Sequence, residues 1–147
     1  MTIAKQLKIK EFPFEIKDSK GKEIYVENSS GFWEKREYDS EGNEIYFENS
    51  NGYWVKREFD SEGKEIYWED SNGYWWKYEY DSEGKDIYHE NSDGYWVKRE
   101  YNSEGKEIYF EDSYGTIYDN RPKTDVQKAI DLLTKEGLIV DGKILKN

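Results

Sequence analysis

Residues 39–59 read DSEGNEIYFENSNGYWVKREF, and similar strings begin at positions 18, 60, 81 and 102, a spacing of 21 residues. Each unit contains two glycines, such as Gly42 and Gly52, and successive glycines lie ten or eleven residues apart and mark turns. The runs between them are rich in Ile, Tyr, Trp and Val, the residue types that favour strands. The sequence therefore predicts five two-stranded β-hairpin repeats over residues 18–121.

The predicted fold class is mainly β, an antiparallel meander of these repeats. A two-sheet sandwich needs a broad aliphatic layer. Because each repeat has only one isoleucine in its strands, too few for such a layer, we expect an open, twisted single-layer sheet or a loosely wound spiral.

Residues 1–17, with apolar residues around Pro13, are expected to form an N-terminal strand cap. Residues 122–147 are expected to form a C-terminal helix plus hairpin cap, in which the helix starts after Thr124 and its apolar residues cover the last strand.

The odd repeat length constrains the strand register. Opposite residues of antiparallel strands share a face, so an odd period requires one turn with an odd residue count and one with an even count. A three-residue Asn-Ser-x-Gly loop sets Tyr25 opposite Lys35. An even Asp-Ser-Glu-Gly turn then sets Lys35 opposite Glu48 and Tyr38 opposite Ile45. One predicted face carries Tyr46, Glu48, Trp54, Lys56 and Glu58, and the other carries Ile45, Phe47, Tyr53, Val55, Arg57 and Phe59.

The charge of the chain favours a basic partner. The chain has 22 basic and 33 acidic residues, a net charge of −11, and no cysteine. This charge repels nucleic-acid phosphates and anionic lipid, so we expect no direct nucleic-acid binding and no membrane binding. The lack of cysteine excludes a disulfide framework and a thiol nucleophile. The first residues do not resemble a signal peptide, and this predicts a cytoplasmic protein.

The single histidine, His89, is the first candidate for chemistry. Its position in the repeat is occupied by Val26, Phe47, Trp68 and Phe110 in the other units. These counterparts indicate a residue on the face of the sheet, and a catalytic or metal role would need a nucleophile or partner ligands nearby.

Repeated glutamates form a second candidate site. Glu48, Glu69 and Glu90 recur beside aromatic residues, as glycosidase carboxylates do. A glutamate in successive units, opposite a lysine, is better explained as a cross-strand charge ladder, since an active site is needed once.

The acidic turn at residues 60–65 superficially suggests a calcium loop, but turn chemistry alone favours Asp at the first and Gly at the fourth turn position. We therefore predict no enzyme activity, no metal and no cofactor.

Departures from the repeat mark a candidate binding surface. The third and fourth units replace smaller or charged counterparts with Trp68, Trp76, Tyr78 and His89. In the predicted register Trp68 lies opposite Trp76 and Tyr78 lies opposite His89, which makes one central aromatic patch. Trp and Tyr are favoured anchors of protein interfaces. Thicker packing at the centre of the sheet, or against a second copy of the chain, would also explain them. The predicted binding residues are Trp68, Trp76, Tyr78, His89, Glu48, Glu69 and Glu90.

Several motifs resemble known repeat families. Residues 38–43, Tyr-Asp-Ser-Glu-Gly-Asn, resemble the Tyr-Asp-x-x-Gly-Asn core of the YD repeats of the RHS family, whose β-hairpins wind into a shell. The spacing of Gly52, Trp54 and Gly63 is similar to that of MORN-type hairpin repeats. The Glu-Asn-Ser-x-Gly-Tyr-Trp pattern, with the ending at residues 114–123, resembles tandem-repeat proteins of bacteriophage and bacterial genomes. These resemblances imply a β-hairpin architecture and a phage-like genomic setting.

The function hypothesis is a non-enzymatic, acidic interaction protein. Together with the phage-like resemblance, it takes the form of an anti-defence protein, an anti-CRISPR or anti-restriction inhibitor. Such a protein would bind a basic surface or the nucleic-acid channel of a host complex. The alternatives are a carbohydrate- or cell-wall-binding module, because Trp and Tyr stack on sugars and form choline cages, and a structural or virion component. Homo-oligomerisation is compatible with each of them.

Overall fold

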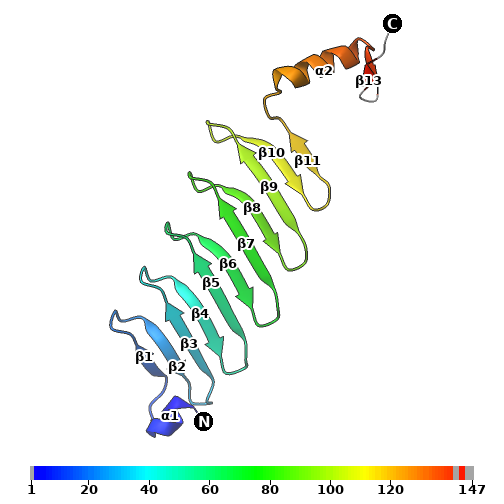
Figure 1. The fold of residues 1–147 in the computed structure, drawn as a ribbon. Coiled ribbons are helices and arrows are strands. Elements are labelled where there is room, and N and C mark those ends of the chain that lie inside the picture. The colour runs from blue at the N-terminus through cyan, green and yellow to red at the C-terminus, as the bar shows by residue number, and fades with distance from the viewer. Residues whose placement is uncertain (1, 141–142, 145–147) are drawn as a thin grey trace.

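Eleven antiparallel strands form one open sheet in the computed structural model, which describes residues 2–140 and 143–144 (Figure 1). Each strand pairs with its neighbours in the chain, so the order in the sheet is the order in the sequence. This confirms the predicted mainly β, open, single-layer meander. The strands are β1 (Phe14–Lys17), β2 (Glu23–Glu27), β3 (Trp33–Tyr38), β4 (Glu44–Asn49), β5 (Trp54–Phe59), β6 (Glu65–Asp70), β7 (Trp75–Tyr80), β8 (Asp86–Asn91), β9 (Trp96–Tyr101), β10 (Glu107–Asp112) and β11 (Ile117–Asp119).

The two turns of each repeat close in the same way. In one, the Asn49 N–H donates to the Tyr53 carbonyl at 2.9 Å, and in the other the Asp39 N–H donates to the Asn43 carbonyl at 3.0 Å. Glycine is the fourth residue of both turns, and Gly52 has a φ of 83°, in the left-handed region that a side chain disfavours. The prediction that the two turns differ in parity is therefore wrong.

A β-bulge in each repeat accounts for the odd number of residues in the period. The predicted pairs Tyr25–Lys35 and Lys35–Glu48 are confirmed. Tyr38, however, lies opposite Glu44 and not opposite Ile45, because the register shifts by one residue after Glu37. The shift leaves Ile45 as the extra residue on its strand, and the same irregularity follows in β5–β6, β7–β8 and β9–β10.

The sheet has two polar faces and a thin core. Face A carries the Tyr-Lys and Glu-Trp cross-strand pairs, such as Tyr46–Lys56 and Glu48–Trp54. Face B carries the pairs of the alternate residues, such as Phe47–Val55. Because the bulge leaves Ile45 without an opposite residue, Ile45 does not follow the strict alternation on which its predicted placement depended. The buried apolar residues among those described are Ala4, Tyr25, Val55 and Val97.

The predicted N-terminal strand is present as β1, and a helix that the sequence pattern does not predict precedes it. Helix α1 (Ile3–Leu7) begins after Thr2, whose hydroxyl caps it, and among the described residues 2–17 only β1 joins the sheet. Two features of Ala4 hold the helix against the sheet. Its side chain is buried, and its backbone N–H donates to Glu27 Oε2 at 3.0 Å. A backbone N–H at a helix start is free to make such a bond, and the sequence pattern does not reveal it.

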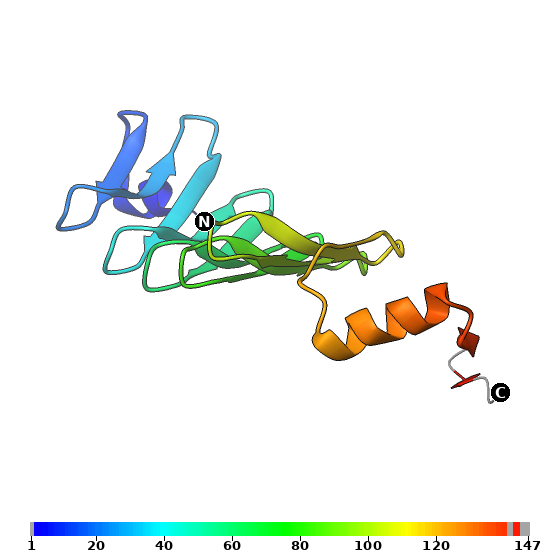
Figure 2. The same ribbon diagram turned by 90° about the horizontal axis from the view of Figure 1, so that it is seen from above.

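The C-terminal segment extends away from the sheet. Helix α2 (Asp125–Lys135) begins after Thr124, as predicted, and β12 (Ile139–Val140) pairs with β13 (Lys143–Ile144) in a separate hairpin. The residues predicted to turn this hairpin, 141–142, lie outside the described residues. The expectation that α2 covers the last strand is wrong, because Val126 of α2 and Ile117 of β11 stay 70% and 62% exposed. The connection containing Pro122 carries α2 beyond the edge of the sheet (Figure 2).

Candidate functional site

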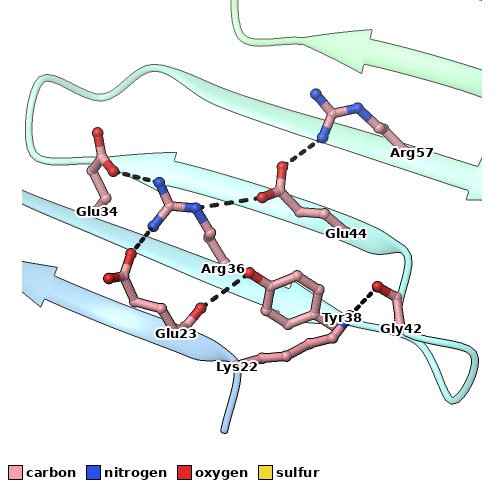
Figure 3. A network of polar contacts seen from close by, with 8 residues as sticks. All are labelled: Lys22, Glu23, Glu34, Arg36, Tyr38, Gly42, Glu44 and Arg57. Atoms are coloured by element: carbon pink, nitrogen blue, oxygen red, sulfur yellow. Dashed lines mark hydrogen bonds and ion pairs between the residues drawn. The ribbon is translucent and has the colours of Figure 1, made fainter. Parts of the chain in front are cut away.

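Arginines bridge neighbouring hairpins on face B. Arg36 on β3 contacts Glu23 of β2 at 2.6 Å and Glu44 of β4 at 3.4 Å, and it also contacts Glu34 at 2.5 Å (Figure 3). Each arginine of this kind lies between the carboxylates that begin the preceding and the following even-numbered strands. We call this row the arginine ladder; it consists of Glu23, Arg36, Glu44, Arg57, Glu65, Asp86, Arg99 and Glu107.

The contacts of the arginine ladder recur along the sheet. Arg57 reaches Glu44 at 2.6 Å and Glu65 at 3.5 Å. Arg99 reaches Asp86 at 2.7 Å and Glu107 at 3.5 Å. These side chains are about a quarter to a third exposed, so the contacts are less screened than ordinary surface ion pairs. The arginine ladder therefore joins successive repeats in place of a hydrophobic core.

The arginine ladder is interrupted on β7. Tyr78 occupies the position of the arginines, so no arginine lies between Glu65 and Asp86. Burial raises the pKa of the Glu65 carboxyl above its usual value, and Arg57 only partly opposes that effect. Asp86 Oδ1 is buried and has no hydrogen-bond partner within the described part of the chain. The interruption leaves two carboxylates without the cation that the other units place between them.

His89 partly compensates for the missing arginine. Its Nδ1 lies 2.6 Å from Asp86 Oδ2, the oxygen that Arg99 also contacts. His89 is thus a partner of the arginine ladder at the one place where the repeat lacks an arginine. The sequence predicted His89 to be a residue of the sheet face, and its role beside Asp86 depends on the register shift that only the structure reveals.

Aromatic rings gather around the interruption. Trp76, Tyr78 and Tyr80 follow one another along β7 with ring centroids 6.0 and 6.4 Å apart and interplanar angles of 12° and 13°. We call these three residues the β7 aromatic row. His89 lies across it, with its ring centroid 5.8 Å from that of Trp76 and 6.1 Å from that of Tyr78. The cluster continues from His89 to Tyr95 at 6.0 Å. Tyr80 and Tyr95 do not stand out in the sequence, because tyrosine or phenylalanine recurs at both positions in most units.

The predicted binding residues divide between the two faces. Trp76, Tyr78 and His89 lie together on face B, and Trp68 is opposite Trp76 in the register, as predicted. Glu48, Glu69 and Glu90 lie on face A, opposite Lys35, Lys56 and Lys77 respectively. The predicted residues therefore do not form a single surface.

On face A, lysines lie opposite glutamates in the register, and lysines also cover some of the tryptophan rings. Glu90 lies 3.8 Å from Lys77 Nζ and accepts a hydrogen bond from the Tyr88 hydroxyl at 3.1 Å. Lys77 Nζ also lies 5.0 Å from the centroid of the Trp75 ring, and Lys56 lies 4.9 Å from Trp54 in the preceding unit. A resident ammonium over each indole competes with any added cation for the same ring face.

The described residues offer no metal centre. Within residues 2–140 and 143–144, no three His, Cys, Asp or Glu side chains are placed to share a metal ion. In the acidic turn at residues 60–65, Asp60 Oδ1 accepts the N–H groups of Glu62 and Lys64 at 2.8 and 2.9 Å. Neither helix described here has the length and apolar character needed to cross a bilayer.

Comparisons with known proteins support the fold and do not assign an activity. No protein-family model and no curated protein matches the chain. The Photorhabdus luminescens Tc holotoxin pore, with the mutation TccC3-D651A, is similar to 68% of this chain, with a TM-score of 0.51 and 16% identity. The TcdB2-TccC3-TEV crystal structure is similar to 77% of this chain, with a TM-score of 0.52 and 15% identity. The matches cover 5% and 6% of those chains, so they show a repeat-type β fold alone.

Proposed function

We propose that this is a non-enzymatic interaction protein that binds a basic protein surface through the β7 aromatic row and the carboxylates beside it. The observation that carries the proposal is the interruption of the arginine ladder at Tyr78. In the flanking units an arginine of the chain itself lies between the two carboxylates. At Tyr78 a cationic side chain of a partner supplies the missing charge.

The chemistry around Tyr78 suits an arginine in particular. Guanidinium groups stack on aromatic faces and bind carboxylates in a planar fork, and Arg36 already lies over the Phe47 ring at 5.3 Å. Glu65 and Asp86 provide the carboxylates, and Tyr78 provides the ring face, because Lys64 Nζ already lies 5.3 Å from the centroid of the Tyr80 ring. The net charge of −11 adds a long-range attraction that speeds the encounter with a basic protein.

A more specific form of this proposal is an anti-defence inhibitor. Proteins that bind nucleic acid present basic channels to phosphates. An acidic sheet that occupies such a channel in a CRISPR or restriction complex would exclude the nucleic acid. The resemblance of the repeats to phage-encoded tandem-repeat proteins supports this setting.

Two other functions remain candidates. Carbohydrate or cell-wall binding needs open aromatic faces, and the lysines over Trp54 and Trp75 on face A weigh against it. A structural or virion component is compatible with an open repeat sheet, whose exposed β11 edge favours assembly. A defined self-assembly in solution is the expected sign of a structural or virion component.

The test uses defined probes with the full-length chain. An arginine-rich peptide, a lysine-rich peptide and a glycan set are titrated at low and high salt, with tryptophan fluorescence as the readout. We expect the arginine peptide to bind most tightly, and its affinity to fall at high salt. Tyr78→Arg fills the gap in the arginine ladder and is expected to weaken binding about tenfold, or about 1.4 kcal/mol.

The matched control is Ser29→Arg, which adds the same charge at an exposed turn far from the row. Equal losses in Tyr78→Arg and Ser29→Arg would show that only net charge matters and would reject the site. Salt-independent binding of a glycan would support the carbohydrate alternative.

A further inference from the structure

Apolar side chains are exposed on two elements at the C-terminal end of the described chain, the edge strand β11 and helix α2. Ile117 and Tyr118 on β11 are 62% and 47% exposed, and Val126 and Ile130 on α2 are 70% and 40% exposed. Leu133 of α2 is also exposed, at 37%. We call these five residues the C-terminal apolar surface. Neighbouring apolar residues of this kind mark interaction sites more often than isolated ones do.

Helix α2 presents these residues as a stripe. Val126, Ile130 and Leu133 are spaced four and three residues apart, which places them on one side of the helix. None of the residues of α2 is buried. An 11-residue helix is marginal in water without tertiary packing, even with the Thr124 cap. At the other end of the molecule, α1 does pack on the sheet, because Ala4 is only 1% exposed.

The edge of β11 is also open. β11 pairs with β10 on one side, and no strand of the described residues pairs with its other side. Exposed edges with apolar side chains accept a further strand. The opposite edge strand, β1, instead exposes Glu15 and Lys17, which pair at 3.2 Å, and charged side chains discourage strand addition.

Charge decides which partner fits this end. Residues 113–138 contain four basic residues (Arg121, Lys123, Lys128 and Lys135) and four acidic residues (Asp119, Asp125, Asp131 and Glu136), so their net charge is zero. The whole chain has a net charge of −11. A basic partner is attracted to the acidic repeats and not to this neutral end. A second copy of the chain is repelled by the repeats and can approach only where the charge vanishes.

We propose that a second copy of this chain docks on the C-terminal apolar surface. The two copies pair β11 with β11 in antiparallel fashion, which continues the meander across a two-fold axis, and the apolar stripe of each α2 is buried in the contact. A two-fold contact uses the same surface on both copies, so assembly stops at two. The acidic repeats then extend in both directions from the junction. This inference does not depend on the proposed basic partner.

The mass in solution tests the proposal. Light scattering of the full-length protein, at roughly 100 µM where even a micromolar dimer is formed, is expected to give twice 17.7 kDa. Val126→Asp combined with Leu133→Asp is expected to give the monomer mass, because it places two charges in the apolar contact. The control Lys128→Asp changes the net charge by the same two units on the opposite side of α2 and is expected to remain dimeric.

A crosslink provides a second test that leaves α2 intact. The chain has no cysteine, and antiparallel pairing of the three-residue strand β11 places Tyr118 close to its own copy. Tyr118→Cys is therefore expected to form a disulfide-linked dimer on oxidation, whereas Ser29→Cys, in the β2–β3 turn, is not. A monomeric mass, growth beyond two copies, or a dimer that survives Val126→Asp with Leu133→Asp would overturn the proposal.

Discussion

Tyr78 and His89 lie opposite each other on β7 and β8, and together they invert the pair that the flanking units repeat. In those units an arginine on the odd-numbered strand lies opposite an aromatic residue, as Arg36 does with Phe47 and Arg99 with Phe110. Here the aromatic residue is on β7, and the imidazole of His89 is on β8. The inversion places an imidazole beside Asp86 in place of a second guanidinium, while Arg99 keeps its contact with the same carboxylate.

The inverted pair predicts a rescue between two substitutions. His89→Phe restores the residue found at positions 47 and 110 but removes one of the two partners of Asp86 Oδ2 and leaves Arg99 as the other, so we expect a loss of about 1 kcal/mol in the free energy of unfolding. Adding Tyr78→Arg restores the arginine between Glu65 and Asp86 and is expected to recover that loss. Urea denaturation of the two single variants and the double variant measures the coupling. Additive effects in this cycle would contradict the arrangement.

The arginine ladder is expected to dominate the stability of face B. Arg57→Met keeps most of the side-chain volume but leaves Glu44 and Glu65 without their shared cation, and we expect a loss of about 2 kcal/mol. Lys56→Met removes an exposed charge on face A and is expected to change stability by less than about 0.5 kcal/mol. The two variants have the same net charge, so urea denaturation separates the effect of the half-buried Arg57 contacts from that of the overall charge.

The lowered pKa of Glu27 predicts that the fold loses stability in acid. Burial alone raises the pKa of Glu27, but hydrogen bonds from Thr2, the Ala4 N–H and the Tyr25 hydroxyl lower that pKa below 4.5 overall. A lowered folded pKa means that the stabilisation is complete above the unfolded pKa and is lost as pH falls through the folded pKa.

Glu27→Gln therefore tests the contact between α1 and β2. We expect the variant to lose about 1–3 kcal/mol at neutral pH and to approach the wild type as the pH falls well below 4.5. Denaturation at several pH values gives the comparison. The exposed Glu58→Gln is the control, and a gap between Glu27→Gln and wild type that does not change with pH would contradict the assignment.

Tyr25 predicts the opposite behaviour in alkali. Burial, and then the hydrogen bond to Glu27, raise the pKa of Tyr25 from 10.0 to about 12. Because the pKa is raised in the folded state, the stabilisation is complete when the pH is below the unfolded pKa of 10.0. It is lost as the pH rises toward 12. Tyr25→Phe is expected to flatten the decline of stability across that window. The exposed Tyr114→Phe should leave it unchanged, and spectroscopic titration of tyrosinate monitors both variants.

The repeats made much of the fold predictable. A 21-residue period, glycine-marked turns and β-forming runs lead directly to an antiparallel meander, and the pairs Trp68–Trp76 and Tyr78–His89 follow from counting residues. The parity of the repeat was correctly recognised as a constraint but assigned to the wrong element. Both turns are alike, and a bulge at the isoleucine accounts for the odd residue. Sequence patterns do not distinguish a longer turn from a bulge, because each adds one residue to the repeat.

Local chemistry in the sequence determined the strands, the turns, the start of α2 and the departures from the repeat, since these depend on residues close together in the chain. Only the tertiary structure decided that Arg57 joins Glu44 to Glu65, that Asp86 meets His89, and that Ala4 binds Glu27. It also decided that α2 lies away from β11. These contacts depend on the face to which each side chain points, and a one-residue bulge reverses that face without changing the pattern of the sequence.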